Sequence, residues 1–216
     1  MFVPKLDHFP APQRRLWPEL SETPGNFTLY GGTALAFHLG HRTSVDFDFF
    51  TSRSFEAVEL TTTIPYLFGA VTRLSRPNAF VAELDRGGPV QVSFFGGLNL
   101  RRVGVPEVTG GVRIASLLDI AATKVKVLGD RASYKDYLDI AAILETGVAL
   151  DQCVGAAQTV YGAAFNPMPS LKALCFFDDL DSPDLVPAGT RRKLCDAART
   201  AGANTIPIVP PLGELG

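Results

Sequence analysis

Two aspartates one residue apart are the side chains of this chain best suited to chemistry. Asp46 and Asp48 lie in the stretch SVDFDFF, residues 44–50, whose alternating apolar and polar side chains predict a half-buried strand. Because residues i and i+2 of a strand project from one face, the two carboxylates would repel each other unless a cation binds between them. Carboxylate oxygens suit Mg²⁺, with Mn²⁺ as the alternative. The pair predicts a metal site, although an acidic strand face is the simpler interpretation of the two aspartates alone.

A glycine pair and a threonine stand ahead of the aspartates. Gly31, Gly32 and Thr33 follow the β-rich run FTLY (27–30) and precede ALAFHL (34–39), a segment of helix formers. Glycines let a backbone approach a ligand closely, amide groups at the start of a helix attract phosphate, and Thr33 would add a hydroxyl at the N-cap. A tight turn with a threonine cap is the alternative for these residues alone. Combined with the aspartates, they predict a unit that binds the phosphates and the metal of a nucleoside triphosphate.

The first half of the chain supplies the strands that would position this unit. A helix is expected around residues 55–68, and a turn at RGGP (86–89) joins two of the strands that follow it. The expected strands are AVTRLS (70–75), FVAELD (80–85) and VQVSFF (90–95). These patterns predict an α/β sheet unit that extends to about residue 113.

The second half of the chain favours helices. Ser116 and Asp119 have the spacing of a capping box and open an apolar helical stripe that stops at Gly129. Ser133 and Asp136 form a second such box, which opens a helix through about residue 145. Further helices are expected near residues 151–163, 168–177 and 188–201.

The patterns together predict an α/β, or α+β, fold in three parts. Residues 1–113 would form an α/β core with a mixed β-sheet. Residues 114–206 would form a helical portion that packs against the core and completes the active site. Residues 207–216 would form a proline-rich tail without secondary structure.

The charge of the chain excludes one class of nucleic-acid binding. The formal net charge is −2 and the pI is near 5.9, so the chain has no overall cationic field that would coat nucleic acid non-specifically. A nucleic-acid substrate would need local clusters, each of which is by itself better explained as solvated surface charge. The candidates are Arg14–Arg15, Arg101–Arg102 and residues 191–193.

The cysteines and the start of the sequence bear on location. Cys153, Cys175 and Cys195 are far apart, odd in number and not in CxxC spacing, which argues against a zinc site and against a disulfide framework. A reducing compartment fits this pattern. The first residues lack the layout of a signal peptide, and no uncharged apolar run approaches membrane-spanning length. We therefore expect a cytoplasmic protein without membrane association.

The glycine and aspartate motif carries a resemblance. The order Gly-Gly-Thr at 31–33 followed by Asp46-Phe-Asp48 looks like the first motif of the polymerase-β-type nucleotidyltransferase superfamily. More narrowly, GGTALAFHLGHRTSVDFDFF resembles the AbiEii/AbiGii toxin family, including Arg42 and Thr43. The segment KVKVLGDRASYKD (124–136) is similar to a second motif of that family. There Lys124, Arg131, Lys135 and Asp136 match in spacing, Val127 departs from the usual alanine, and Asp139 follows one helical turn later.

The resemblance implies transfer of a nucleoside monophosphate from an NTP to an acceptor. In some family toxins that acceptor is the 3′ end of tRNA, and the toxin is paired with a separately encoded antitoxin. It implies that Asp46 and Asp48 hold the metal and that Lys124 lies against the triphosphate. Asp136 or Asp139 would orient that lysine, the nucleotide or the acceptor hydroxyl. The nucleotide-binding residues implied are Gly31, Gly32, Thr33, Arg42, Lys124 and Asp139.

Purely structural explanations exist for two of these residues, and the chain differs from the superfamily pattern at one position. Lys124 could be a solvated helix lysine, and Asp136 could serve only as a capping-box carboxylate. Many polymerase-β-type enzymes place a third carboxylate on a later strand, where this chain has Ser93. Glu83 and Asp85 are the possible substitutes. Two alternative functions stay open. One is transfer to a small molecule or protein, which the acidic pI allows, and the other is a nucleotide-binding module without turnover.

Overall fold

The structure is a computed structural model that describes residues 2–131 and 133–215. Met1, Ala132 and Gly216 lie outside the described residues. Met1 is the first residue of the predicted core, Ala132 belongs to the 124–136 motif, and Gly216 is the last residue of the predicted tail. The chain divides into two compact units. The first comprises the residues up to Leu100, Val105–Ser116 and the residues from Glu214, and the second comprises Arg101–Gly104 and Leu117–Gly213.

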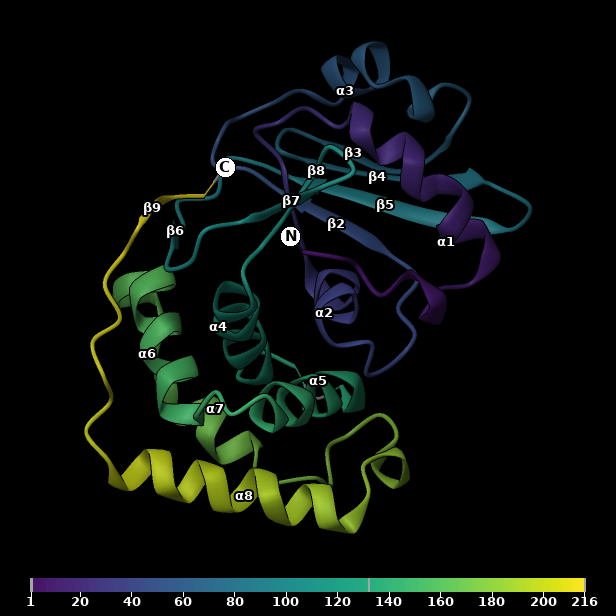
Figure 1. The fold of residues 1–216 in the computed structure, drawn as a ribbon. Helices are drawn as coiled ribbons and strands as arrows, with labels where there is room; N and C mark the ends of the chain where they lie inside the picture. The colour runs from purple at the N-terminus through teal and green to yellow at the C-terminus, as the bar shows by residue number, and fades with distance from the viewer. Residues whose placement is uncertain (1, 132, 216) are drawn as a thin grey trace. The chain divides into compact units, whose positions relative to one another are not determined.

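The first unit is built on a seven-stranded sheet in the order β3-β4-β5-β2-β1-β8-β7 (Figure 1). Strand β2 runs antiparallel to β1 and parallel to β5, and β1 runs parallel to β8, so the sheet is mixed as expected. The strands are β1 (Thr28–Tyr30), β2 (Phe47–Phe50), β3 (Val71–Arg76), β4 (Ala79–Asp85), β5 (Pro89–Phe95), β7 (Glu107–Thr109) and β8 (Val112–Ile114).

Alternation of side chains explains why β4 and β5 form where the sequence predicts them. Every second residue of β4 is buried, and Phe94 of β5 stacks on Phe49 of β2 with ring centroids 5.4 Å apart. The β4–β5 hairpin turns through Gly87 and Gly88, whose φ angles of 76° and 146° favour glycine. Both glycine amides donate to the carboxylate of Asp85, at 2.8 and 2.9 Å.

The helices of the first unit are short. The helix expected at residues 55–68 is interrupted, because Pro65 has no amide hydrogen and holds Ile64 in an extended conformation. The helical elements are η1 (Leu6–His8), α1 (Ala11–Leu16), η2 (Trp17–Glu22), α2 (Gly31–Leu39), α3 (Ala57–Thr63) and η3 (Pro65–Leu67).

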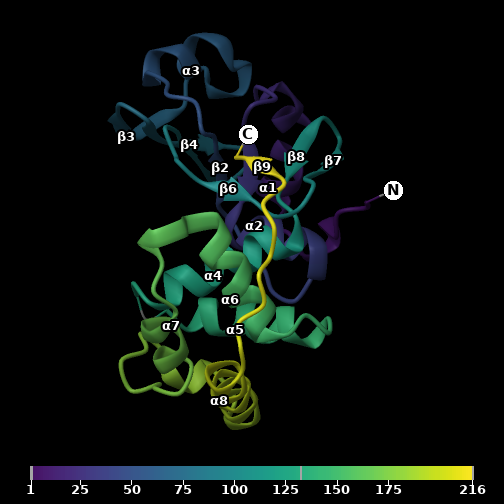
Figure 2. The same cartoon turned by 90° about the vertical axis from the view of Figure 1, so that its left-hand side faces the viewer.

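The second unit is helical, with α4 packed against α5, α6 and α7 (Figure 2). The helices expected near 117–128, 133–145, 151–163, 168–177 and 188–201 are all present. They are α4 (Leu117–Leu128), α5 (Tyr134–Glu145), α6 (Leu150–Tyr161), α7 (Pro167–Ala173) and α8 (Ala188–Ala203), with the short elements β6 (Arg101–Arg102), η4 (Gly162–Ala164) and η5 (Pro183–Leu185).

The expectation about the cysteines is wrong in one respect. Cys175, just after α7, and Cys195, on α8, form a disulfide. The two helices pack together and bring residues 20 positions apart within bonding range, which sequence spacing alone does not show. Cys153 is the free cysteine; it is buried, and burial raises the pKa of its thiol to about 12.

The proline-rich tail is also more ordered than expected. It contains a short strand, β9 (Gly213–Glu214). In the second unit the Leu212 amide donates to the carbonyl of Arg102 at 2.8 Å. In the first unit the Leu215 amide donates to the carbonyl of Leu100 at 3.0 Å. Prolines remove amide donors but leave their carbonyls and the other amides able to pair, so the prediction of a tail without secondary structure is wrong.

No single helix of the described residues has both the length and the apolar character needed to cross a membrane. One bent pair, Tyr134–Glu145 with Leu150–Ala164, meets those criteria jointly, by length and composition only.

Candidate functional site

The glycine pair accommodates two of the predicted site residues. Helix α2 begins at Gly31, directly after β1, and Gly31 has a φ of 75°. A Cβ atom at Gly31 would lie 2.7 Å from Oδ2 of Asp48, and one at Gly32 would lie 2.6 Å from Nη2 of Arg42. The structure therefore brings Asp48 and Arg42 against the first turn of α2, where a side chain at either glycine would have to displace them.

Asp48 is held by the centre of the sheet. It lies opposite Tyr30 of β1 and opposite Ser93 of β5. Its neighbours Phe47 and Phe49 are 1% and 0% exposed, so the alternation of the strand directs the Asp48 side chain to the other face. A carboxylate at the start of a helix is favoured electrostatically by the helix dipole.

Asp46 lies just before β2 rather than within it. The strand was expected from residue 44, but it begins at Phe47, and Val45 is 41% exposed. Two buried side chains hold this segment instead of sheet hydrogen bonds. Thr33 Oγ1 donates to the backbone carbonyl of Asp46, and Gln13 Nε2 donates to the carbonyl of Val45 at 3.2 Å.

Thr33 does not have the capping role that was expected. The N-cap of α2 is Tyr30, and Thr33 is a buried residue of the first turn whose hydroxyl bonds to Asp46. Thr33 thus contacts Asp46 through the backbone carbonyl of that residue, and its predicted role in nucleotide binding stays a prediction.

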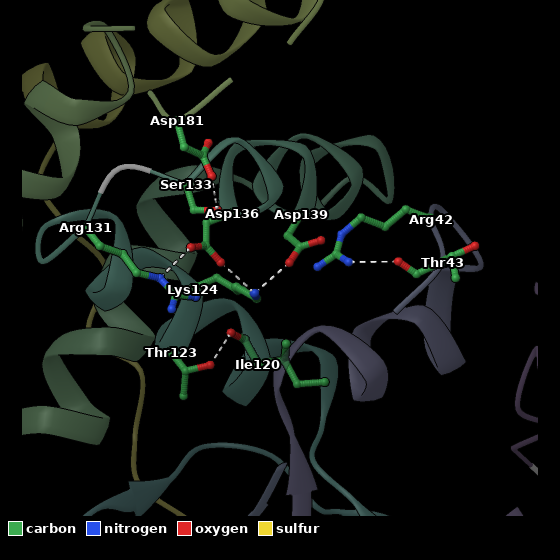
Figure 3. Close-up of polar contacts among 10 residues, drawn as sticks. All are labelled: Arg42, Thr43, Ile120, Thr123, Lys124, Arg131, Ser133, Asp136, Asp139 and Asp181. Atoms are coloured by element: carbon green, nitrogen blue, oxygen red, sulfur yellow. Dashed lines mark hydrogen bonds and ion pairs between the residues drawn. The ribbon is translucent and has the colours of Figure 1, made fainter. Parts of the chain in front are cut away.

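Arg42 lies on the loop between α2 and β2. Its Nη1 donates to the carbonyl of Thr43 at 3.0 Å, a contact visible in Figure 3. Thr43 Oγ1 donates in turn to the carbonyl of His8 at 3.3 Å. These contacts fix the loop, while Arg42 Nη2 lies over Gly32 at the start of α2.

The position expected for a third carboxylate is occupied by Ser93. Ser93 is 2% exposed and pairs directly with Asp48 across β2 and β5. The suggested substitutes have other contacts: Glu83 forms an ion pair with Arg73 at 3.0 Å, and Asp85 binds the amides of the β4–β5 turn. The structure gives no support for either as a replacement.

The donor set at Asp46 and Asp48 suits magnesium. Among residues 2–131 and 133–215, no group of three or more histidine, cysteine, aspartate or glutamate side chains could hold a metal ion. Two carboxylates match the way Mg²⁺ is bound in nucleotide enzymes, where water and substrate phosphates complete the shell.

In the second unit, Lys124 lies between two carboxylates. Its Nζ is 2.8 Å from Oδ1 of Asp136 and 2.6 Å from Oδ2 of Asp139, while Nε of Arg131 is 3.0 Å from Oδ2 of Asp136 (Figure 3). The side chains of Lys124, Asp136 and Asp139 are 8%, 1% and 0% exposed. Lys124 thus forms a buried cluster with the two carboxylates, and Arg131, whose side chain is 65% exposed, adds a second cation at its edge.

The bland interpretations of Lys124 and Asp136 are wrong. Lys124 is buried rather than a solvated helix lysine. In the described structure Ser133 makes no side-chain cap at α5, and Asp136 binds Lys124 and Arg131. The carboxylate that caps α5 comes from Asp181, whose Oδ1 accepts the Tyr134 amide hydrogen bond at 3.0 Å.

Sequence reasoning missed Gln13 and Asp181. Gln13 lies on the inward face of α1 and is 3% exposed, so a polar residue in an apolar position was the only signal for it. No sequence signal pointed to Asp181, because its role depends on the fold of the chain between α7 and α8.

The basic clusters of the sequence contribute to the structure of each unit. Arg15 Nη1 donates to the carbonyl of Arg86 at 3.0 Å, Arg102 Nη1 to that of Gly104 at 3.0 Å, and Arg191 Nε to that of Val186 at 2.8 Å. One arginine of each cluster therefore donates a hydrogen bond to a backbone carbonyl of its own unit.

Two solved structures share this fold. MenT4, a nucleotidyltransferase toxin from Mycobacterium tuberculosis, matches 89% of this chain and 82% of its own with a TM-score of 0.63 and 15% identity. A candidate nucleotidyltransferase from H. pylori matches 88% of this chain and 91% of its own with a TM-score of 0.52 and 17% identity. At these identities the similarity defines the fold, which is the nucleotidyltransferase fold expected from the first motif.

A match to a protein-family model assigns the chain to a family. The model of the nucleotidyl transferase AbiEii toxin of Type IV toxin–antitoxin systems matches residues 15–199, and the chain belongs to the AbiEii family. The resemblance drawn from the two motifs is confirmed. An uncharacterized protein of Aquifex aeolicus is 33% identical over 119 residues, which cover 53% of this chain and 56% of that protein. The chain thus spans little more than half the length of that relative.

Proposed function

We propose that this protein is a metal-dependent nucleotidyltransferase that moves a nucleoside monophosphate from an NTP to RNA, with the 3′ end of tRNA as the acceptor. The observation that supports this most directly is the packing of Asp48 against Gly31 at the start of α2. A carboxylate that could bind a metal then lies beside the start of a helix, where backbone amides suit phosphate. Membership of the AbiEii family supports the reaction class and the role as the toxin of a toxin–antitoxin pair, which implies a cognate antitoxin.

Asp46 and Asp48 would hold Mg²⁺, or Mn²⁺ in its place. The bound ion would supply positive charge for the phosphoryl group that is transferred and for the pyrophosphate that leaves. In the absence of a third carboxylate at Ser93, the two aspartates carry the protein's share of metal binding.

The first turn of α2 and Arg42 would bind the phosphates. Gly31 and Gly32 leave the helix start open to a ligand, and the guanidinium of Arg42 lies over Gly32. A planar guanidinium presents donors that match phosphate oxygens. Thr33 would contribute to binding indirectly, by fixing Asp46.

Lys124 would act in the same reaction as an oriented cation. Two of the three donors of its ammonium group point to Asp136 and Asp139. We propose that these carboxylates set the direction of the lysine and that its third donor contacts the nucleotide. Asp139 would then belong to the nucleotide-binding residues through the lysine that it holds.

A second candidate function follows from Ser93. The residue directly opposite Asp48 lacks the carboxylate that related enzymes have there, so a nucleotide-binding module without turnover is the alternative. Such a protein would bind an NTP with metal but release no pyrophosphate.

The test is to incubate the protein with Mg²⁺, each of the four α-labelled NTPs and total RNA, with the Asp48→Asn variant in parallel. Asp184→Asn is the matched control, because Asp184 is exposed in η5. We expect label on RNA with the wild type and the control and none with Asp48→Asn. Label on protein or small molecules would show that the acceptor is not RNA. NTP binding without pyrophosphate release would favour the nucleotide-binding module without turnover.

A further inference from the structure

The backbone on either side of Asp46 is fixed by two side chains. The carbonyl of Val45 belongs to the peptide group before the Cα of Asp46, and the carbonyl of Asp46 belongs to the one after it. Gln13 donates to the first and Thr33 to the second. Because peptide groups are planar, anchoring both carbonyls restrains both backbone dihedrals of Asp46 and so sets the direction of its side chain.

These two donors act on a residue that precedes the described sheet pairing. The registers of β2 with β1 and β5 begin at Phe47 or later, so Asp46 precedes the described ladder. Gln13 and Thr33 are 3% and 1% exposed, and each comes from a packed helix, α1 or α2. A carboxylate outside the sheet is thereby held by rigid elements, which a site requires for precise geometry.

The amide of Gln13 serves this bond at a cost. Its Oε1 is buried and has no hydrogen-bond partner within the described structure. An unsatisfied buried acceptor is unfavourable, and an apolar side chain of similar length would avoid it. The glutamine is therefore not explained by stability alone, and its one described hydrogen bond is the contact with Val45.

The same N-terminal segment anchors the rest of the loop that carries Asp46. Lys5 donates through its amide to the carbonyl of Phe37 at 3.1 Å and through Nζ to that of Leu39 at 2.9 Å. Gly40, with a φ of 63°, ends α2 against the side chains of Lys5 and His8. The loop is thus tied to residues 5–13 at its start and, through Gln13, at its end.

We propose that Gln13 is a positioning residue, which orients the Asp46 carboxylate for metal binding through its hydrogen bond to the Val45 carbonyl. The inference rests on the proposed function, since it concerns the metal that Asp46 would hold.

The test compares Gln13→Met with the wild type in two measurements. Mn²⁺ affinity in the presence of an NTP is measured by EPR, and kcat and KM are measured by steady-state kinetics. Gln13→Met keeps the length of the side chain and removes both the donor and the unsatisfied oxygen. We expect a folded protein that binds Mn²⁺ at least about fivefold more weakly, with kcat lowered about tenfold and the KM for the NTP changed less than about twofold. Gln91→Met, on the exposed side of β5, is the matched control and should leave all three values unchanged.

Thr33 provides an independent check from the other carbonyl. Thr33→Val keeps the shape but loses the donor, and we expect it to weaken Mn²⁺ binding in the same way. Thr33→Ser keeps the hydroxyl and should restore most of the affinity.

The outcomes separate this inference from the proposed function. Wild-type protein that binds no Mn²⁺ would refute the metal site itself. Wild-type protein that binds Mn²⁺, together with a folded Gln13→Met variant of unchanged Mn²⁺ affinity, would overturn the positioning role and leave the metal site standing.

Discussion

The carboxylate of Asp48 occupies the space in which a side chain at Gly31 would stand. A Cβ atom there would lie 2.7 Å from Asp48 Oδ2, well inside van der Waals contact. The motif that pairs glycines with aspartates 15 or so residues later is therefore one physical unit. Gly31 therefore leaves space for the Asp48 carboxylate as well as for a ligand.

Replacing Gly31 with alanine should damage the site more than the fold. The φ of 75° makes any larger residue unfavourable by about 1–2 kcal/mol, and the new methyl group must displace the Asp48 carboxylate. We expect nucleotidyl transfer to fall about tenfold or more, measured as kcat/KM. Thermal unfolding should show only the modest loss of stability.

Gly25→Ala is the control for that substitution. A Cβ at Gly25 meets nothing within 4 Å, so both stability and activity should be close to those of the wild type. A Gly31→Ala protein with full activity would contradict the placement of Asp48 over the helix start.

The sequence predicted the sheet and the helices well because their side-chain periods are strong. The alternating strands β4 and β5 and the apolar stripe of α4 are local patterns, and both lie where they were expected. The start of β2 was misplaced because Val45 continues the alternation, although the chain has already left the sheet at that residue.

The candidate site could be predicted only as far as its motifs reach. Asp46, Asp48 and the glycine pair were found from spacing, and in the structure Asp48 and Gly31 are neighbours. The buried partners of the site could not be found this way. Gln13 is 32 residues from Val45, and Asp181, which caps α5, is 47 residues from Tyr134, so these contacts exist only after folding. Whether the predicted residues bind metal and nucleotide stays a prediction.

The disulfide between Cys175 and Cys195 should stabilise the second unit. It closes a segment of 20 residues, and a loop of that size is worth about 3 kcal/mol in chain entropy. We expect Cys175→Ser, or a reductant, to lower the free energy of unfolding by up to that amount. Titration of thiols in denaturant without reductant checks the pairing itself: one thiol per chain, from Cys153, is expected, and three would rule out the disulfide in the purified protein.

His38 should make stability depend on pH. Burial lowers its pKa in the folded protein, opposed in part by its hydrogen bond to the Ala115 carbonyl and by Glu107, whereas the unfolded chain has the ordinary value of 6.5. Between these two values the unfolded state binds more protons. The free energy of unfolding should therefore fall as the pH drops below about 6.5 and level off below the folded pKa.

The check is urea unfolding of wild type and His38→Gln between pH 5 and 8. Glutamine keeps a donor for Ala115 but does not titrate, so its profile should be flatter over that range. His8→Gln, at an exposed position, serves as the control. Identical slopes for wild type and His38→Gln would show that another group is responsible.

Lys124 should be as important for folding as for any reaction. Removing its charge leaves Asp136 and Asp139 buried without their shared cation, and breaking a buried ion pair from one side typically costs about 3–5 kcal/mol. We expect Lys124→Met to lose about that much in urea unfolding. Lys126→Met, two residues along α4, removes the ion pair with the half-exposed Asp130 and should cost about 1 kcal/mol or less.

A double-mutant cycle separates the two roles of this lysine. Lys124→Met combined with Asp139→Asn removes one cation and one carboxylate, so its stability should recover relative to Lys124→Met alone. Because the double variant still lacks the proposed nucleotide contact, its transfer activity should stay low. Recovery of activity together with stability would show that Lys124 supports only the fold, and that the nucleotide must be bound without it.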